Sequence, residues 1–532
     1  MTVRYRVLVA DAIAPEGLAP LRSDPRFELL DRPGLSGPAL AEAMVGVDAV
    51  LVRSATRITR DSLARADRLT VIGRAGVGVD TIDVDAATER GIAVLTAPAG
   101  NTISAAELTL ALILALVRRV PAADRSMRAG QWDRKSFNGA ELQGKTLGLL
   151  GAGRIGSEVA RRARAFGMRV IAYDPFLTEE RAQAIGLELA PLEAIIREGD
   201  IISVHVPLTD KTTGLLGEKE LSMMKPTAFV VNVARGGVVD ERALHRALTE
   251  NRIAGAALDV FETEPLPADH ELRSLANVVL TPHLGASTAE AQHSVALEIA
   301  DAVRAALLEG DLSRAVNAPA IGGAEMRRLR PMMDLAQRLG KLASALVDGA
   351  VERAEVRYAG GSDQALRPLT VGAMMGALAT AVGKTSINFV NALHVAESRG
   401  IRVDRVRSAS HGDYAEYLEL RLASGGGEAR VGGALLAESH PRLVLIGEYR
   451  VDIVPTGTLV VITNRDVPGV IGRVGTILGD AGVNIGEYYQ ARLRAGGEAL
   501  AAISVDGRLT TDVIASLQSI ADVHDVRQAQ LD

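Results

Sequence analysis

Ten short apolar runs, separated by stretches with helical spacing, occupy the chain from residue 3 to about residue 315. The runs are rich in β-branched residues and lack clean alternation, which is typical of parallel strands covered on both faces. Alternation of strands and helices predicts doubly wound α/β folding. Ten strands are too many for one compact sheet, so we expect two α/β lobes. Long helices over residues 103–120 and 287–310 would bridge the lobes and leave a cleft between them.

The remaining residues indicate two further units. A chain of 532 residues is long enough for three or four domains of about 150 residues. After Ala318-Pro319 helical and strand-like stretches mix without a chemical motif, which indicates an α+β unit. The last 75 or so residues have the order βαββαβ, which is typical of a ferredoxin-like sandwich. We therefore predict a first lobe over 1–100 completed by 287–317, a second lobe over 101–286, a third unit over 318–453 and a fourth over 457–532.

Composition excludes several classes of function. A net charge of -6 argues against nucleic acid or an anionic membrane as a partner. The absence of cysteine excludes disulfides, thiolate zinc sites and a cysteine nucleophile, and no metal site is expected. The amino terminus lacks the pattern of a signal peptide, and no apolar run is long enough to span a bilayer. We expect a cytoplasmic protein.

A glycine triplet lies in the segment LGLLGAGRIGSEVARRARAFGMRVIAYDP, residues 147–175. Gly151 permits a tight turn, Gly153 lets the backbone approach a pyrophosphate, and Gly156 lets the following helix pack against the strand. The helix amino terminus offers unpaired N–H groups to phosphate. Asp174, at the end of the next strand, can accept hydrogen bonds from ribose hydroxyls and would repel a 2′-phosphate. The segment predicts a site for NAD rather than NADP. The alternatives are a structural glycine turn and another nucleotide-binding use of the fold.

Polar side chains follow three later strands. Arg235 follows AFVVNVA, Glu264 follows GAALDVF, and His283 follows NVVLTP. Because the carboxyl ends of strands in an open α/β sheet line one crevice, these side chains are expected to converge. An imidazole can take a hydroxyl proton as hydride leaves the same carbon, a carboxylate can hold that imidazole, and an arginine can grip a carboxylate. The set predicts hydride transfer on a 2-hydroxy acid, although spacing alone leaves a structural role for His283 open.

These segments resemble a known family. GAGRIG with AYDP, VNVARGGVVDE, ALDVFETEP and TPHLGAST are similar to the signatures of NAD-dependent D-2-hydroxyacid dehydrogenases. VRSATRIT, GRAGVGVDTID and NTISAAEL resemble more closely the branch that oxidises D-3-phosphoglycerate. The resemblance covers residues 3–317 and continues to the end, since the long form of that branch has an intervening domain and then an ACT domain. It implies two flavodoxin- or Rossmann-like lobes and the catalytic roles given above.

The resemblance also extends the NAD site. It implies that Arg154 and Ile155 lie along the pyrophosphate and that Asp259 lies near the nicotinamide carboxamide. Val77 and Val206 stand where some relatives have threonine, so only backbone or apolar contact with NAD is expected from them. The nicotinamide side is expected to be lined by Val233, Ala234, Arg235, His283, Leu284, Gly285 and Ala286.

A phosphorylated substrate needs cations in the first lobe, across the cleft. Arg53 and Ser54 follow one predicted strand and Arg74 follows the next, so they should face the same crevice. Arginine suits a dianionic phosphate. The alternative is that both arginines are ordinary surface cations. Further candidates for substrate contact are the backbone N–H groups of Gly76 and Val77, and Asn101.

The last unit contains NRDVPGVIGRVGTILGDAGVNI, which is similar to the ACT signature. ACT domains pair side by side and bind amino acids at their interface. The resemblance therefore implies that Asn464, Asp466 and Asn484 contact L-serine. A turn-forming aspartate and a strand-starting asparagine are the structural alternatives. For the intervening unit the resemblance implies a role in assembly and in allosteric regulation by anions, without naming site residues.

The function implied is NAD-dependent oxidation of D-3-phosphoglycerate to 3-phosphohydroxypyruvate, the first step of L-serine biosynthesis. Inhibition by serine, reduction of 2-oxoglutarate as a second activity, and a homo-oligomer (dimer or tetramer) are implied with it. Two alternatives stay open. One is another D-2-hydroxyacid dehydrogenase, such as a glyoxylate or hydroxypyruvate reductase, which would not need Arg53 and Arg74. The other is an NAD-sensing, corepressor-like interaction protein.

Overall fold

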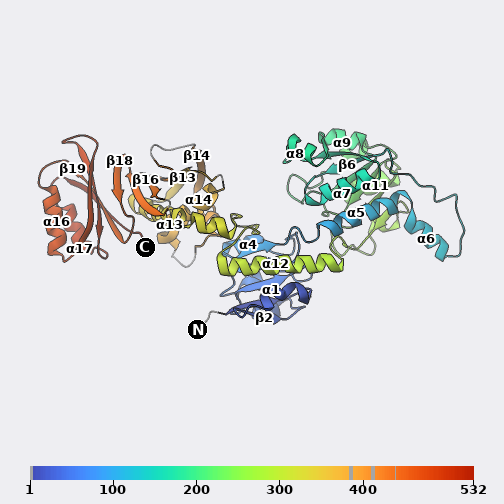
Figure 1. Cartoon of the computed structure of the whole chain (residues 1–532), viewed down its shortest axis with the longest axis horizontal. Helices are drawn as coiled ribbons and strands as arrows, with labels where there is room; N and C mark the ends of the chain where they lie inside the picture. The colour runs from blue at the N-terminus through green and yellow to red at the C-terminus, as the bar shows by residue number, and fades with distance from the viewer. Residues whose placement is uncertain (1–3, 363, 383–386, 409–413, 438) are drawn as a thin grey trace.

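The computed structural model describes residues 4–362, 364–382, 387–408, 414–437 and 439–532. Within these ranges four β-sheets follow one another along an elongated molecule (Figure 1). The first two sheets are entirely parallel, as the alternation of strands and helices predicts. The expected α/β class with two doubly wound lobes is confirmed.

The first sheet has the strand order β2-β1-β3-β4-β5. Strands β3 and β5 are buried along their whole length, and Val295, Ile299 and Val303 of α12 (Ala289–Glu309) join the core of this sheet. The elements are β1 (Tyr5–Val9), η1 (Pro15–Leu18), α1 (Ala19–Arg22), β2 (Phe27–Asp31), α2 (Gly37–Ala43), β3 (Ala49–Val52), α3 (Arg60–Leu63), β4 (Val71–Arg74), α4 (Val84–Glu89) and β5 (Ala93–Thr96).

The second sheet has the order β12-β11-β10-β9-β6-β7-β8. The strand order reverses beside β6, which is the position where open α/β sheets bind ligands at their carboxyl ends. The elements are α5 (Thr102–Val117), α6 (Val120–Arg128), β6 (Thr146–Leu150), α7 (Arg154–Ala165), β7 (Arg169–Tyr173), α8 (Glu179–Ala184), β8 (Glu188–Leu189), α9 (Leu192–Glu198), β9 (Ile201–Val204), α10 (Glu218–Met223), β10 (Phe229–Asn232), α11 (Glu241–Thr249), β11 (Gly255–Leu258), η2 (Glu271–Ser274) and β12 (Val278–Leu280).

The two long helices expected between the lobes are α5 and α12. Thr288 caps α12 by accepting from the Ala291 N–H, and Gly310 ends it with φ 68°. The helix expected over 103–120 is shorter, because it ends at Val117 and Arg119 then adopts φ 54°. A separate helix, α6, begins at Val120 and projects away from the lobe (Figure 1).

The third sheet, β14-β13-β15-β16-β17-β18, packs against α13 and α14. Only its β13–β14 pair is parallel. The elements are α13 (Gly323–Leu346), β13 (Val351–Ala359), α14 (Leu366–Val382), α15 (Ala392–Ser398), β14 (Arg402–Ser408), β15 (Tyr417–Ser424), β16 (Gly427–Leu436), β17 (His440–Ile446) and β18 (Tyr449–Ile453).

The fourth sheet, β20-β21-β19-β22, is antiparallel and belongs to the expected βαββαβ unit. Alternate residues of β19 divide between two cores: Val460 and Ile462 pack in the core of α16 and α17, whereas Leu459 and Val461 join the core of the preceding unit. The last two units therefore share apolar surface. The elements are β19 (Thr458–Arg465), α16 (Val470–Asp480), β20 (Ile485–Arg492), β21 (Glu498–Val505), α17 (Thr511–Gln518) and β22 (Val523–Gln530).

The described ranges contain neither a membrane-spanning helix nor a cluster of metal-binding side chains. No helix there has the length and hydropathy needed to cross a bilayer. No group of three or more His, Asp or Glu side chains there is placed to hold a metal ion.

Candidate active site

His283 and Glu264 form a close pair at the carboxyl edge of the second sheet. The His283 Nδ1 lies 2.7 Å from the Glu264 Oε2, and the other Glu264 oxygen accepts a hydrogen bond of 3.1 Å from the Phe261 N–H. Burial opposes ionisation of Glu264, but the hydrogen bond and charge of His283 hold its pKa below the usual range. Half of the His283 side chain is exposed, so its Nε2 is the ring nitrogen left for a ligand.

Asp259 anchors the loop that carries His283. Its carboxylate is fully buried and accepts from the backbone N–H groups of Leu284 (2.7 Å) and Gly285 (2.9 Å) and from the Thr281 hydroxyl (2.6 Å). Burial raises its pKa, and these hydrogen bonds oppose that rise. The His283 backbone has φ 55° and its N–H donates to the Asp259 carbonyl. Asp259 thereby fixes the strained turn on which the imidazole stands.

Arg235 lies in the turn after β10, and the Asn232 side chain stabilises this turn. The buried Asn232 amide donates to the Arg235 carbonyl (2.8 Å) and accepts from the Ala234 N–H (3.0 Å). The Arg235 Nη1 donates to the Ala234 carbonyl at 2.6 Å, and its Nε lies 3.5 Å from a carboxylate oxygen of Asp80 in the first lobe. The guanidinium therefore lies where the two lobes meet.

The glycine triplet has the geometry of a dinucleotide cradle. A side chain on Gly151 (φ 94°) would meet the His205 carbonyl at 2.7 Å, and one on Gly156 would meet the Gly151 carbonyl at 2.4 Å. Nothing lies within 4 Å of the equivalent position on Gly153, so space remains above the amino terminus of α7. Asp174 accepts from the Ala152 N–H (2.9 Å), which places its carboxylate beside this turn. These residues fit NAD.

Arg74 and Arg53 lie at the carboxyl ends of β4 and β3. Burial, with the nearby charges of Arg235 and Arg53, lowers the pKa of Arg74 to about 10. The buried Arg74 Nε and the Asn101 Oδ1 are polar atoms without a hydrogen-bond partner. Unpaired buried polar atoms are costly, so their presence here is consistent with a ligand that completes them. The Arg53 side chain donates to the Ala12 carbonyl, and Ser54 is exposed.

Comparison with known proteins identifies this arrangement. Residues 110–285 match the NAD binding domain of D-isomer specific 2-hydroxyacid dehydrogenases, and residues 328–447 match the D-3-phosphoglycerate dehydrogenase intervening domain. A D-3-phosphoglycerate dehydrogenase of Synechocystis sp. is 40% identical over 99% of this chain and 95% of its own length. Its counterpart in Methanocaldococcus jannaschii is 40% identical over 98% of this chain and 99% of its own. This chain belongs to the D-3-phosphoglycerate dehydrogenase family.

Membership of the family settles the enzyme class. The chain is an NAD-dependent oxidoreductase, so the alternative of an interaction protein without enzyme activity falls away. Solved structures agree over the two lobes. The TT0316 protein of Thermus thermophilus has a TM-score of 0.54 and 38% identity, covering 58% of this chain and 99% of that one. A D-lactate dehydrogenase of Aquifex aeolicus complexed with NAD and lactic acid has a TM-score of 0.51 and 31% identity, covering 58% and 98%.

The other residues expected at the NAD site differ in how far they are exposed. Arg154 and Ile155 open α7, directly after the glycine turn. Val77 and Leu284 are exposed, whereas Val233 and Gly285 are buried. Val206 and Ala286 are half-buried. Their contacts with NAD remain predictions.

The structure does not bring together the three residues expected to bind serine. Asn464 is buried at the carboxyl end of β19, bonded to the Arg465 carbonyl and to Gln490. Asp466 accepts from Arg492 and the Gly496 N–H. Asn484 donates to Asp506 (3.0 Å) beside the far end of β21. Seven residues of β21 separate the two places, which is about 23 Å of strand. A ligand that touches all three needs two copies of this unit.

Two residues that position the site were missing from the sequence interpretation. Asn232 lies inside the VNVARGG segment, where it reads as one more strand residue. Asp80 lies six residues after Arg74, and nothing local indicates that it meets an arginine of the other lobe. Only the buried polar character of Asn232 in an apolar strand gave a signal.

Proposed function

We propose that this enzyme oxidises D-3-phosphoglycerate to 3-phosphohydroxypyruvate, the first step of L-serine biosynthesis. The observation that carries the proposal is the buried, unpaired Nε of Arg74, whose guanidinium lies near the charge of Arg235. Arg235 in turn lies near Glu264 of the His283–Glu264 pair. A cation held in this way suits a second anionic group on a 2-hydroxy acid. The names of full-length relatives support the same substrate.

Each side chain of the cleft has a defined part in the proposed reaction. Bound NAD supplies the hydride acceptor. The His283 Nε2 takes the proton of the C2 hydroxyl as hydride leaves C2, so the carbon is oxidised to a ketone. Glu264 holds the ring through Nδ1 and stabilises the imidazolium that forms. Arg235 grips the substrate carboxylate, which fixes C2 in place.

The phosphate is assigned to the first lobe. Arg74 and Arg53, with Ser54, offer positive charge and donors at the ends of β4 and β3. The Val77 N–H and the Asn101 side chain complete the proposed substrate contacts. The Gly76 N–H, expected from the sequence to bind substrate, instead donates to the Arg74 carbonyl at 2.8 Å. The same two arginines suit the distal carboxylate of 2-oxoglutarate, which would accept their hydrogen bonds. Reduction of that dicarboxylate is therefore part of the proposal.

The test is NADH absorbance with three substrates: D-3-phosphoglycerate, D-glycerate and D-2-hydroxyglutarate. We expect kcat/KM to be highest for the phosphorylated acid. A glyoxylate reductase of Paecilomyces thermophila shares the fold, with a TM-score of 0.54 and 32% identity over 59% of this chain and 99% of that one. Equal or higher kcat/KM with D-glycerate would favour that reductase class instead.

We also propose that the last unit is an ACT domain and that L-serine inhibits through it. Its βαββαβ topology and the NRDVPG segment support this assignment. The separation of Asn464 and Asp466 from Asn484 supports a site shared by two copies, each providing one end. Calorimetric titration of the full-length enzyme with serine tests the proposal, and absence of heat would remove serine as the ligand.

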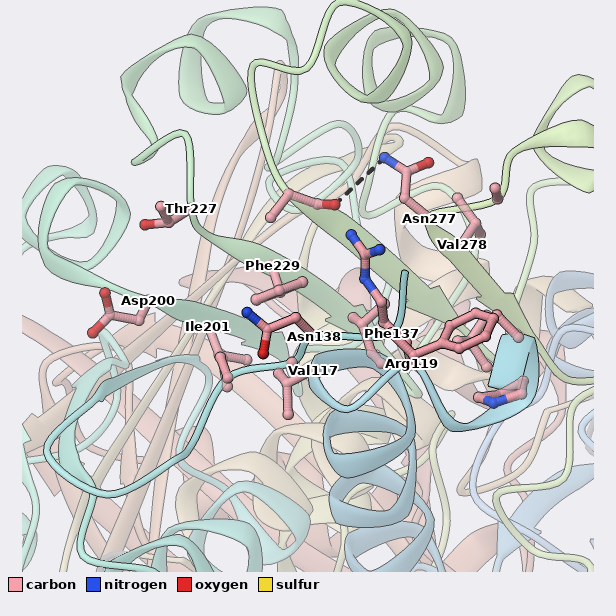
Figure 2. A pocket seen from close by; sticks show the side chains of 18 of the residues that line it. Val117, Arg119, Phe137, Asn138, Asp200, Ile201, Thr227, Phe229, Asn277 and Val278 are labelled. Atoms are coloured by element: carbon pink, nitrogen blue, oxygen red, sulfur yellow. Dashed lines mark hydrogen bonds between the residues drawn. The ribbon is translucent and has the colours of Figure 1, made fainter. Parts of the chain in front are cut away.

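A homo-oligomer, dimer or tetramer, belongs to the same proposal. The arm formed by α6 and residues 129–141 buries none of its α6 side chains and exposes Val120, Met127 and Trp132, the last at 79%. A cavity of about 650 Å³ lies between the base of this arm and the amino ends of β9 to β12, away from the catalytic cleft. Figure 2 shows Val117, Phe137 and Asn138 around it, with Ile201, Phe229 and Val278 from the sheet.

These features support a dimer in which a second copy of the chain packs against the arm. An exposed tryptophan on an arm whose helix buries no side chain is typical of an interface rather than of a free surface. Light scattering of wild type and Trp132→Ala gives the test, with a shift of the variant towards monomer as the expected result. A cytoplasmic location is included in the proposal, because NAD and phosphorylated hydroxy acids are intracellular metabolites.

A further inference from the structure

Arg235 is held from both lobes. Its backbone and Nη1 are fixed within the second lobe by Asn232 and the Ala234 carbonyl. Its Nε instead lies 3.5 Å from the Asp80 Oδ2, on the loop that follows β4 in the first lobe. The arginine is 26% exposed, whereas Asp80 is 65% exposed at the mouth of the cleft. The orientation of the guanidinium therefore depends on a residue from across the cleft.

The loop that carries Asp80 is shaped to receive this guanidinium. A Cβ on Gly78 would lie 2.3 Å from the Arg235 Nη2 and 2.6 Å from the Asp80 Oδ2. The φ of Gly78 is outside the left-handed region, so its lack of a side chain matters for space rather than for backbone conformation. The close approach of Arg235 needs a glycine at this place.

Three arginines lie close together where the lobes meet, so a nearby carboxylate is needed to offset their positive charge. The nearby charges of Arg235 and Arg53 disfavour the charged form of Arg74. The Asp11 carboxylate already accepts hydrogen bonds from the backbone N–H groups of Arg53 and Thr56 and from the Thr56 hydroxyl. Asp80 pairs with Arg235 and, like Asp11, favours the charged form of Arg74.

We propose that Asp80 is a positioning residue that holds the Arg235 Nε from the opposite lobe, so that the Nη groups face the substrate carboxylate. A carboxylate on Nε fixes the plane of the guanidinium, and a bidentate grip depends on that plane. The site for the substrate carboxylate is then complete only when the loop that carries Asp80 in the first lobe contacts Arg235 in the second lobe. The proposal rests on the proposed role of Arg235 and adds to it a residue that the family signatures above do not assign.

The first test is steady-state kinetics of Asp80→Asn, which keeps the shape and removes the charge. We expect KM for D-3-phosphoglycerate and for D-glycerate to rise equally, about two- to fivefold, because the contribution of an exposed ion pair rarely exceeds this range. We expect kcat to change less and the NADH dissociation constant, from fluorescence, to stay at the wild-type value. Asp80→Glu should recover part of the loss. Asp85→Asn, another exposed acid of the same lobe, is the matched control and should change neither constant.

The second test asks whether Asp80 acts through Arg235. In an Arg235→Lys background, Asp80→Asn should raise KM less than twofold further. Gly78→Ala, which crowds the same pair, should raise KM like Asp80→Asn. An unchanged or lowered KM in Asp80→Asn would overturn the proposal, as would a full additional loss in the Arg235→Lys background. Normal kcat/KM in Arg235→Lys alone would instead refute the carboxylate role of Arg235 itself.

Discussion

The His283 Nδ1 and the Glu264 Oε2 lie 2.7 Å apart, although the two residues are nineteen positions apart along the chain. Their loops follow β12 and β11, which are neighbouring parallel strands with Leu258 opposite Leu280. Both loops therefore start at the same edge of the sheet. The buried Asp259 then fixes the loop after β12, which carries His283, through three hydrogen bonds. The sheet geometry and this anchored loop therefore place the two side chains together.

His283→Ala should lower kcat by roughly 10²–10⁴-fold, the usual effect of losing a positioned acid–base group. NADH binding should be retained, since the glycine turn and Asp174 are unaffected. Stopped-flow absorbance gives the rate and fluorescence titration gives the binding. His293→Ala, a histidine of α12 outside the pair, serves as the control. Turnover near the wild-type rate would remove His283 from the reaction.

Asp174→Ala should weaken NAD binding and narrow its advantage over NADP. The physical reason is that the repulsion of a 2′-phosphate disappears together with the acceptor for the ribose hydroxyls. The variant also loses the hydrogen bond from the Ala152 N–H. The ratio of kcat/KM for the two cofactors is the measurement. An unchanged ratio would mean that another residue reads the ribose.

Arg74→Ala should raise KM for D-3-phosphoglycerate roughly ten- to a hundredfold more than for D-glycerate, since a charge-assisted hydrogen bond contributes about 1.5–3 kcal/mol. Because burial lowers the pKa of Arg74 to about 10, its charge is present below that pH and is lost above it. The preference for the phosphorylated acid should thus be flat near neutral pH and decline only as the pH approaches 10. Equal effects of Arg74→Ala on both substrates would indicate a structural role.

Asn484→Ala should leave kcat and KM near wild type and abolish inhibition by serine. The residue is exposed in the last unit, far along the chain from the catalytic pair. Inhibition requires that serine bind two conformations of the enzyme unequally, so loss of its contacts removes the effect. Turnover across a serine titration is the measurement, with Asp480→Asn as an exposed control from the same unit. Inhibition of Asn484→Ala at wild-type serine concentrations would place the site elsewhere.

Glu419→Gln should flatten the acid dependence of stability in the third unit. Burial opposes the charge of Glu419, but Arg430, Tyr417 and Arg421 hold its pKa at about 2. A lowered pKa in the folded state contributes stability above the unfolded value of 4.5, and this is lost as the pH falls towards 2. The shift corresponds to about 3 kcal/mol. Urea unfolding from pH 7 to pH 2 measures it, and the exposed Glu428→Gln should behave like wild type.

Much of the site could be anticipated because its parts are local. Gly151, Gly153 and Gly156 each meet a steric need within one strand–turn–helix unit, so their spacing alone indicates a nucleotide turn. Arg235, Glu264 and His283 each follow a strand, and parallel strands bring their carboxyl ends to one edge. The helix break at Arg119 was missed, because a left-handed residue other than glycine has no sequence signature.

The sequence by itself determined the α/β class, the order of strands and helices, and the edge of the sheet at which the polar side chains gather, because hydrophobic periodicity and turn chemistry act over a few residues. Only the tertiary structure decided that Asp80 meets Arg235 across the cleft, that Asn464 and Asn484 lie at opposite ends of one sheet, and that the last two units share apolar surface. Those relationships join segments far apart in the chain. They depend on how whole lobes and sheets pack, which no local pattern encodes.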